Sequence, residues 1–200
     1  NKIFFPEFDP LAGTLAAFAT YSVGFFARPL GGVIFGHYGD KIGRKSMLLI
    51  TLFLMGVPTI LIGLIPSYES IGYWAAVLLV TMRFLQGIAV GGEWGGAVLM
   101  AVEHAPEGKK GFFGSLPQAG VAPGLILSSL AMGAVAALPE DQMLSWGWRI
   151  PFLASVVLLL VGWFIRVKVA ESPDFEHMKS KGDKVEMPAK VVLKKYPREV

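Results

Sequence analysis

The chain has 200 residues, of which 54% are hydrophobic and only 16% are charged, and its formal net charge is +3. A soluble globular domain carries about 25% charged residues, so this composition argues against a soluble protein. The absence of cysteine excludes disulfides, zinc–thiolate sites and thiol nucleophiles.

Five apolar stretches are each long enough to cross a bilayer, which takes roughly 20 mainly apolar residues in a helix. In chain order they are 11–35, 47–65, 73–102, 111–138 and 146–165. The stretches between them are short and hold most of the charges and turn-forming residues. The sequence therefore predicts an all-α membrane protein, with a transmembrane helical unit over residues 11–165.

Lys and Arg are distributed unevenly along this pattern. The stretches near 37–46 and 103–110 and the tail after Ile165 hold three, two and nine of them, which is 14 of the 18. The connections on the opposite side hold only Lys2. Because Lys and Arg accumulate on the cytoplasmic side, we expect residues 1–10 to be a periplasmic loop and residues 166–200 to be a cytoplasmic linker. An amphipathic surface helix over 186–200 is the alternative for the tail.

Charged residues inside the predicted spans are candidates for a polar pathway. A charge at the centre of a bilayer costs at least about 2.5–3.5 kcal/mol, so Arg28, Arg83 and Glu93 should face a bundle interior or a water-filled cavity. Helical spacing places Gln86 and Trp94 on the same broad face as Arg83 and Glu93. We predict that these five residues form the substrate and proton pathway. A purely structural role, with bonds to carbonyls or to neighbouring groups, remains open for the charged residues.

Small residues and prolines predict close helix packing. Gly87, Gly91 and Gly95 recur at four-residue spacing, which lets helix backbones approach closely in lipid. Pro117 and Pro123 each remove a helical hydrogen bond, so we expect a bend in the span 111–138.

Residues 36–45, between the first two spans, carry a recognisable motif. They resemble the signature G-x-x-x-D-[RK]-x-G-[RK]-[RK], which lies between the second and third helices of the major facilitator superfamily. The six constrained positions are matched by Gly36, Asp40, Lys41, Gly43, Arg44 and Lys45, and Gly39 lies at a free position within the motif. The resemblance implies a cytoplasmic gating element. A phosphate-binding loop is rejected, because Arg44 stands where that loop needs Lys and a membrane helix precedes the motif.

Four further segments are similar to the metabolite:proton symporter family within that superfamily: 27–32, 83–87, 91–96 and 146–152. That family includes transporters of shikimate, α-ketoglutarate, citrate and proline/betaine. Within it the chain looks most like the shikimate transporter and its uncharacterised bacterial relatives. The resemblance implies that the five spans are helices 2–6 of a twelve-helix fold, an incomplete amino-terminal half. Its first helix and its carboxy-terminal half are the expected intramolecular partners. Glu103 and Glu171 are expected to pair with Arg44.

These observations predict a secondary active transporter in the bacterial inner membrane. It would take up a small organic metabolite, an anionic carboxylate, by alternating access, with a proton gradient as its energy source and no cofactor, metal or nucleic acid. Glu93 is the acid expected to respond to protons, since burial favours the neutral form of a carboxyl group. An uncoupled facilitator of a polar solute, or a channel or sensor on the same fold, is the alternative.

An enzyme is not expected from this sequence. His37, His104 and His177 lack the spacing of metal ligands, and no set of nucleophile and base is present.

Overall fold

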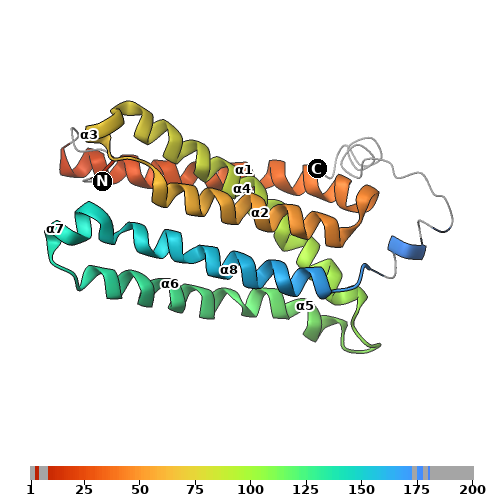
Figure 1. The fold of residues 1–200 in the computed structure, drawn as a ribbon. Helices are drawn as coiled ribbons and strands as arrows, with labels where there is room; N and C mark the ends of the chain where they lie inside the picture. Colours follow the sequence, from red (N-terminus) through yellow and green to blue (C-terminus); the bar gives the residue numbers. More distant parts are fainter. Residues whose placement is uncertain (1–2, 5–8, 173–174, 178–179, 181–200) are drawn as a thin grey trace.

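The structure, a computed structural model, describes residues 3–4, 9–172, 175–177 and 180. Every regular element in these residues is a helix, which confirms the predicted all-α class. The long helices lie side by side as an elongated bundle (Figure 1). The tail segment 186–200, for which a surface helix or a linker was considered, lies outside the described residues.

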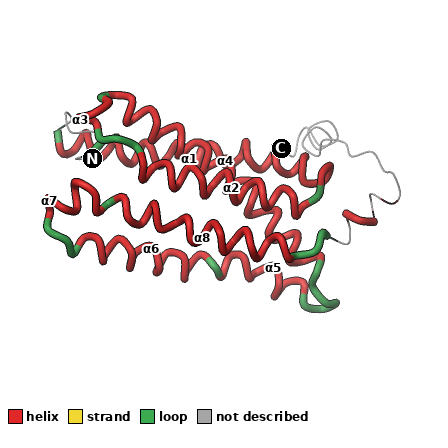
Figure 2. The backbone as a smooth tube through the Cα atoms, in the orientation of Figure 1, coloured by secondary structure: helices red, strands yellow, loops and turns green. Residues whose placement is uncertain are grey.

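The helices are joined by short connections, drawn in green in Figure 2. In chain order they are α1 (Pro10–Ile42), α2 (Arg44–Leu64), α3 (Tyr68–Ile71), α4 (Tyr73–Glu103), α5 (Lys110–Ala119), α6 (Val121–Ala136), α7 (Glu140–Gln142), the π-helical turn η1 (Met143–Gly147) and α8 (Arg149–Lys168). We call the end of the bundle where α1 meets α2 the Gly43 end. The opposite end, where α3 meets α4, is the Gly72 end.

The motif at residues 36–45 is almost entirely helical, whereas the sequence suggested a loop near 37–46. α1 continues to Ile42, and α2 begins two residues later. Gly43 alone reverses the chain, with φ 103° and ψ 143°. This left-handed region of φ is accessible to glycine without steric cost, so one residue suffices for the turn.

The helices form two layers (Figure 1). α1, α2 and α4 make up one layer, in which α4 packs against both other helices. α8 packs against α2 from the second layer and also contacts α6, while the far end of α4 contacts α5. A small apolar core closes the Gly72 end and consists of Ile62, Ile65, Ala75 and Leu79.

α1 and α4 touch backbone to backbone through glycines. A Cβ atom at Gly87 would overlap the backbone of Gly24, and one at Gly91 would overlap the backbone of Arg28. Gly31 meets the carbonyl of Ile88 in the same way. Gly95, the third member of the predicted series, has no neighbour within 4 Å of such an atom. The close approach of the two helices therefore depends on Gly87 and Gly91 and not on Gly95.

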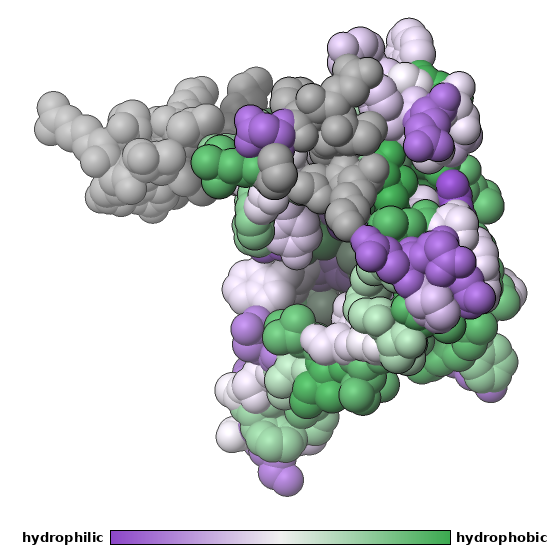
Figure 3. Space-filling view, turned by 90° about the vertical axis from the view of Figure 1, so that its left-hand side faces the viewer, coloured by the Kyte–Doolittle hydropathy of each residue, from purple (hydrophilic) through white to green (hydrophobic). Residues whose placement is uncertain are grey.

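Four helical segments of the described chain are long and apolar enough to cross a membrane: Arg44–Leu64, Tyr73–Glu103, Lys110–Ala136 and Arg149–Lys168. α1 has 33 residues and is long enough, but it does not reach the same apolarity. Within α6 only Val135 is buried, so most apolar side chains of that helix face outward. Figure 3 looks onto the Gly72 end, where hydrophilic patches alternate with larger hydrophobic areas.

The fourth predicted span is interrupted. α5 ends at Ala119, and α6 begins at Val121 after Gly120. Pro123 has no backbone N–H to donate to the carbonyl of Ala119, four residues earlier, so the helical ladder is weakened at this point.

Candidate functional site

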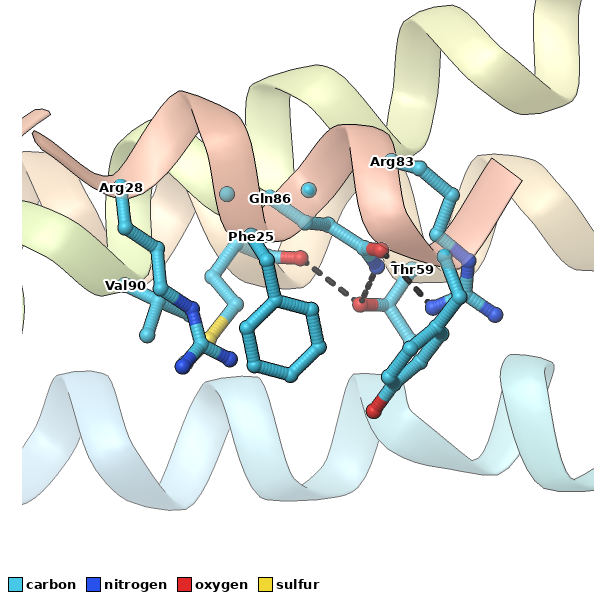
Figure 4. A pocket seen from close by; sticks show the side chains of 10 residues that line it. Phe25, Arg28, Thr59, Arg83, Gln86 and Val90 are labelled. Atoms are coloured by element: carbon cyan, nitrogen blue, oxygen red, sulfur yellow. Dashed lines mark hydrogen bonds between the residues drawn. The ribbon is translucent and has the colours of Figure 1, made fainter. Parts of the chain in front are cut away.

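A cavity of about 230 Å³ lies between α1, α2 and α4 (Figure 4). It brings together Arg28, Arg83 and Gln86, three of the five pathway residues predicted from the sequence. The complete lining is Tyr21, Gly24, Phe25, Arg28, Met55, Thr59, Arg83, Gln86, Gly87 and Val90. The close contact of α1 with α4 at Gly24 and Gly87 forms part of its wall.

A chain of hydrogen bonds joins α4 to α2 inside this cavity. Arg83 donates from Nη1 to Oε1 of Gln86, 3.1 Å away. Gln86 donates from Nε2 to Oγ1 of Thr59 at 2.7 Å, and the Thr59 hydroxyl donates to the carbonyl of Met55 at 2.7 Å. The Arg83 guanidinium is therefore hydrogen-bonded to Gln86, and the Gln86 side chain is fixed in turn by its bond to Thr59.

Aromatic rings from α1 lie against both guanidinium groups. The guanidinium carbon of Arg28 is 4.0 Å from the centre of the Phe25 ring, and that of Arg83 is 5.5 Å from the Tyr21 ring. The two rings are themselves 5.5 Å apart. Stacking of this kind stabilises a cation. Phe25 lies between the head group of Arg28 and Thr59 in Figure 4.

The charge in this cavity is unbalanced. It contains two arginines, and no Asp or Glu is among the described residues that line it. A guanidinium has five N–H donors, and in the described chain one donor of Arg83 and none of Arg28 reaches a protein acceptor. The remaining guanidinium N–H donors lie in a mainly apolar wall and favour an anionic occupant. A planar carboxylate matches the fork geometry of a guanidinium.

Glu93 and Trp94 lie outside this cavity lining. Glu93 forms an ion pair with Arg166 near the end of α8, and Arg166 also donates to the backbone carbonyl of Leu48 in α2. Trp94 donates from Nε1 to Oε1 of Gln118 in α5, at 3.3 Å. The structure thus places the predicted proton-responsive acid in a link between α4 and α8, nearer the Gly43 end.

At the Gly43 end the motif residues meet acidic groups. Arg44 pairs with Glu103, as expected, and lies 3.8 Å from Asp40. The side chains of Arg44 and Glu103 are only 15% and 9% exposed, so the pair is largely shielded from solvent. The hydroxyl of Ser172, a fully buried residue, also donates to Glu103.

Glu171 was expected to pair with Arg44, but in the structure its carboxylate binds backbone N–H groups. Its Oε1 accepts the backbone N–H groups of Lys45 and Ser172, each at 3.0 Å. The N–H of Lys45 belongs to the first turn of α2, where helical donors have no partner within the helix. A negative charge is also favourable at this end of a helix. Glu171 therefore caps α2, and Gly43 leaves room for it, since a Cβ there would overlap the carboxylate.

The remaining motif glycines border a second cavity of about 250 Å³ between α1, α2 and α4. Gly36 and Gly39 lie on its α1 side together with Asp40. The Nζ of Lys45 points away to α8 and donates to the carbonyl of Val167 at 2.8 Å.

α2 is also held at its other end by α8. Arg149, the first residue of α8, donates to the carbonyls of Gly63 and Ile65 at 2.7 and 2.8 Å. A cation at the last carbonyls of a helix complements the helix dipole. α2 therefore has an acid at its start and a cation at its end. Glu171 follows the end of α8 by three residues, and Arg149 is the first residue of α8.

Several residues of these sites were not predicted: Tyr21, Phe25, Met55, Thr59, Arg149, Arg166 and Ser172. For the α1 residues a signal existed, because Tyr21, Phe25 and Arg28 follow the i, i+4, i+7 spacing of one helix face. Thr59 carried no such signal, since its role depends on which helix lies opposite.

Comparison with known structures defines the class of protein. The fold matches that of the proton:xylose symporter XylE of the major facilitator superfamily, determined with bound 6-bromo-6-deoxy-D-glucose. The TM-score is 0.77 at 19% identity, and the match covers 90% of this chain and 40% of that one. The described helices therefore share the fold of part of that transporter.

Comparison of sequences is more specific. Residues 9–198 match the family described as "Sugar (and other) transporter". The shikimate transporter of Escherichia coli (strain K12) is 55% identical over 177 residues, which are 88% of this chain and 40% of that protein. The inner membrane metabolite transport protein YhjE of the same strain is 44% identical over 197 residues, 98% of this chain and 45% of that protein.

The chain belongs to the sugar (and other) transporter family, whose members are transporters and not enzymes. It spans less than half the length of the curated relatives that it matches.

Proposed function

We propose that the full-length protein takes up a small organic carboxylate together with protons by alternating access. The observation that carries this proposal is the cavity with Arg28 and Arg83 and without an acidic lining residue in the described chain. In this fold class the substrate lies near the bilayer midplane between two helical halves. The relative named as a shikimate transporter supports a hydroxylated ring carboxylate as the substrate class.

The orientation that we propose places the Gly43 end in the cytoplasm. Arg44 and Lys45 lie at this end, and the stretch 103–110 and the end of α8 contribute further Lys and Arg residues. The positive-inside rule assigns such an end to the cytoplasmic side. The name of the relative YhjE supports the bacterial inner membrane as the location.

The ion pair of Glu93 with Arg166 supplies a route for proton coupling. Both side chains are about one-fifth exposed, and the pair joins α4 to α8. Proton binding to Glu93 removes its charge and with it the attraction for Arg166. Loss of the pair would remove this direct ionic link between α4 and α8, although both helices stay packed against α2. We propose this change as the step that links proton binding to the transport cycle.

Competition for uptake tests the substrate class. The full-length protein in proteoliposomes is given labelled shikimate and an excess of shikimate, shikimamide, succinate, benzoate or glycine betaine in separate assays. We expect shikimate and at least one other carboxylate to compete, and the neutral amide to compete at least about 10-fold more weakly, because it lacks the charge that the guanidinium groups bind. Equal competition by the acid and its amide would contradict an anion site.

A further inference from the structure

Thr59 lines the cavity, and its hydroxyl takes part in two hydrogen bonds, one as donor and one as acceptor. The hydroxyl donates its only hydrogen to the carbonyl of Met55, one turn earlier in α2. Its oxygen therefore acts only as an acceptor toward Gln86, and the group of Gln86 at 2.7 Å from it has to be the amide nitrogen. This arrangement fixes the orientation of the Gln86 amide.

The orientation of that amide determines how Arg83 is held. With Nε2 bound to Thr59, the oxygen of Gln86 faces Arg83 and accepts from Nη1 at 3.1 Å. In the flipped orientation two donors, the amide N–H₂ and the guanidinium, would face each other. Thr59, which does not touch the guanidinium, thereby selects the orientation of Gln86 that binds it (Figure 4).

Arg28 has no comparable support. It rests on the Phe25 ring, it is exposed, and no hydrogen bond ties it to the part of the chain that the structure describes. The two arginines of the cavity are therefore unequal. Arg83 is preorganised, and a preorganised group binds a ligand at a smaller entropic cost than a mobile one.

α2, the helix that carries Thr59, is fixed in its position along α8. Glu171 and Lys45 tie its first turn to the end of α8, and Arg149 ties its last carbonyls to the start of α8. Two ties at opposite ends prevent α2 from sliding along α8. The position of α2 along α8 thus fixes where the Thr59 hydroxyl meets Gln86.

We propose that Thr59 is a positioning residue that acts through Gln86 to aim Arg83 at the carboxylate of the substrate. This inference rests on the proposed function, because it requires an anionic substrate at Arg83. It predicts that the hydroxyl of Thr59 contributes to substrate affinity and not to the rate of the transport cycle.

Uptake kinetics of the full-length protein in proteoliposomes test the inference, with labelled shikimate as the probe. Thr59→Val keeps the shape of the side chain and removes the hydroxyl. We expect KM to rise roughly 3- to 10-fold, the value of one hydrogen bond, while the maximal rate per reconstituted protein stays within about twofold. Thr59→Ser retains the hydroxyl and should restore the parent KM. Thr81→Val is the matched control, since within the described residues Thr81 bonds only to the Val77 carbonyl of its own helix.

A double-mutant cycle separates this role from a general loss of structure. If Thr59 acts through Gln86, adding Thr59→Val to Gln86→Leu should raise KM no further. Additive effects, or a KM for Thr59→Val equal to that of Thr81→Val, would overturn the inference and leave the proposed function standing. If the parent protein takes up no carboxylate, the proposed function fails and this inference with it.

Discussion

Arg83 and Arg28 line the same cavity, but their surroundings differ. Arg83 is hydrogen-bonded to Gln86, whereas Arg28 only stacks on Phe25. A lysine ammonium can replace a guanidinium above an aromatic ring, but it lacks the planar fork that bonds Gln86 and a carboxylate at once. The same conservative substitution should therefore have different effects at the two positions.

We expect Arg83→Lys to raise the KM for carboxylate uptake about 10- to 100-fold, since it removes charge-assisted hydrogen bonds with defined geometry. Arg28→Lys, its matched control, should raise KM less than about fivefold, because cation and stacking are both retained. Uptake of labelled shikimate by the two reconstituted full-length variants measures this difference. Equal losses would show that Arg83 is not the preorganised member of the pair.

The residues of the cavity differ in how well the sequence predicts them. Arg28, Arg83 and Gln86 stand out because a polar side chain in an apolar span requires an explanation. Tyr21 and Phe25 share the helix face of Arg28, which is a weak signal, whereas the role of Thr59 depends only on the packing of α2 against α4. Glu171 lies outside the cavity, at the Gly43 end, and is a third case. Its acidic character predicts a cationic partner, but the structure provides backbone N–H groups of Lys45 and Ser172 instead.

At the scale of elements, the interface of α1 with α4 determines whether the cavity forms. Gly87 lies in the contact with Gly24, and both residues also line the cavity. An added methyl group at Gly87 meets backbone atoms, which cannot rotate away as a flexible side chain can. The two helices would have to separate, and the side chains of both would lose packing.

We expect Gly87→Ala to destabilise the protein by about 1–3 kcal/mol, the usual cost of overpacking a tight interior. Gly95→Ala is the control on the same helix, because nothing lies within 4 Å of its added Cβ. Alanine is also the better helix former, so this variant should be as stable as the parent or more so. Thermal unfolding of the two purified full-length variants in detergent measures both. A Gly87→Ala melting temperature equal to that of Gly95→Ala would exclude the backbone contact.

The sequence predicts the long helices well, because each lies in a long, mainly apolar stretch, although α1 is less apolar than the others. It predicts the junctions poorly. The motif at 36–45 suggests a loop, but its glycine at position 43 allows a turn of one residue between two helices. The bend expected in 111–138 is an interruption at Gly120, next to the carbonyl that Pro123 leaves without a donor. Junctions depend on a few dihedral angles and on neighbouring helices, which hydrophobic periodicity does not report.

At the scale of the whole molecule, the ionic contacts gather toward the Gly43 end. Arg44 with Glu103, Glu171 at the start of α2, and Arg166 with Glu93 connect α2, α4 and α8 there. Largely shielded ion pairs of this kind give little net stability, but breaking one is costly. They therefore hold α2, α4 and α8 in place relative to one another at this end.

Accumulation of a carboxylate under an imposed proton gradient tests the central claim most directly. The full-length protein in proteoliposomes receives labelled shikimate with the outer solution one pH unit more acidic than the lumen. A monoanion carried with one proton should accumulate up to about 10-fold inside, since one pH unit is worth about 1.4 kcal/mol, and a protonophore should abolish the accumulation. Protein-free liposomes under the same gradient correct for passive entry of the protonated acid. Equilibration without accumulation, unchanged by the gradient, would identify an uncoupled facilitator and contradict proton-coupled transport.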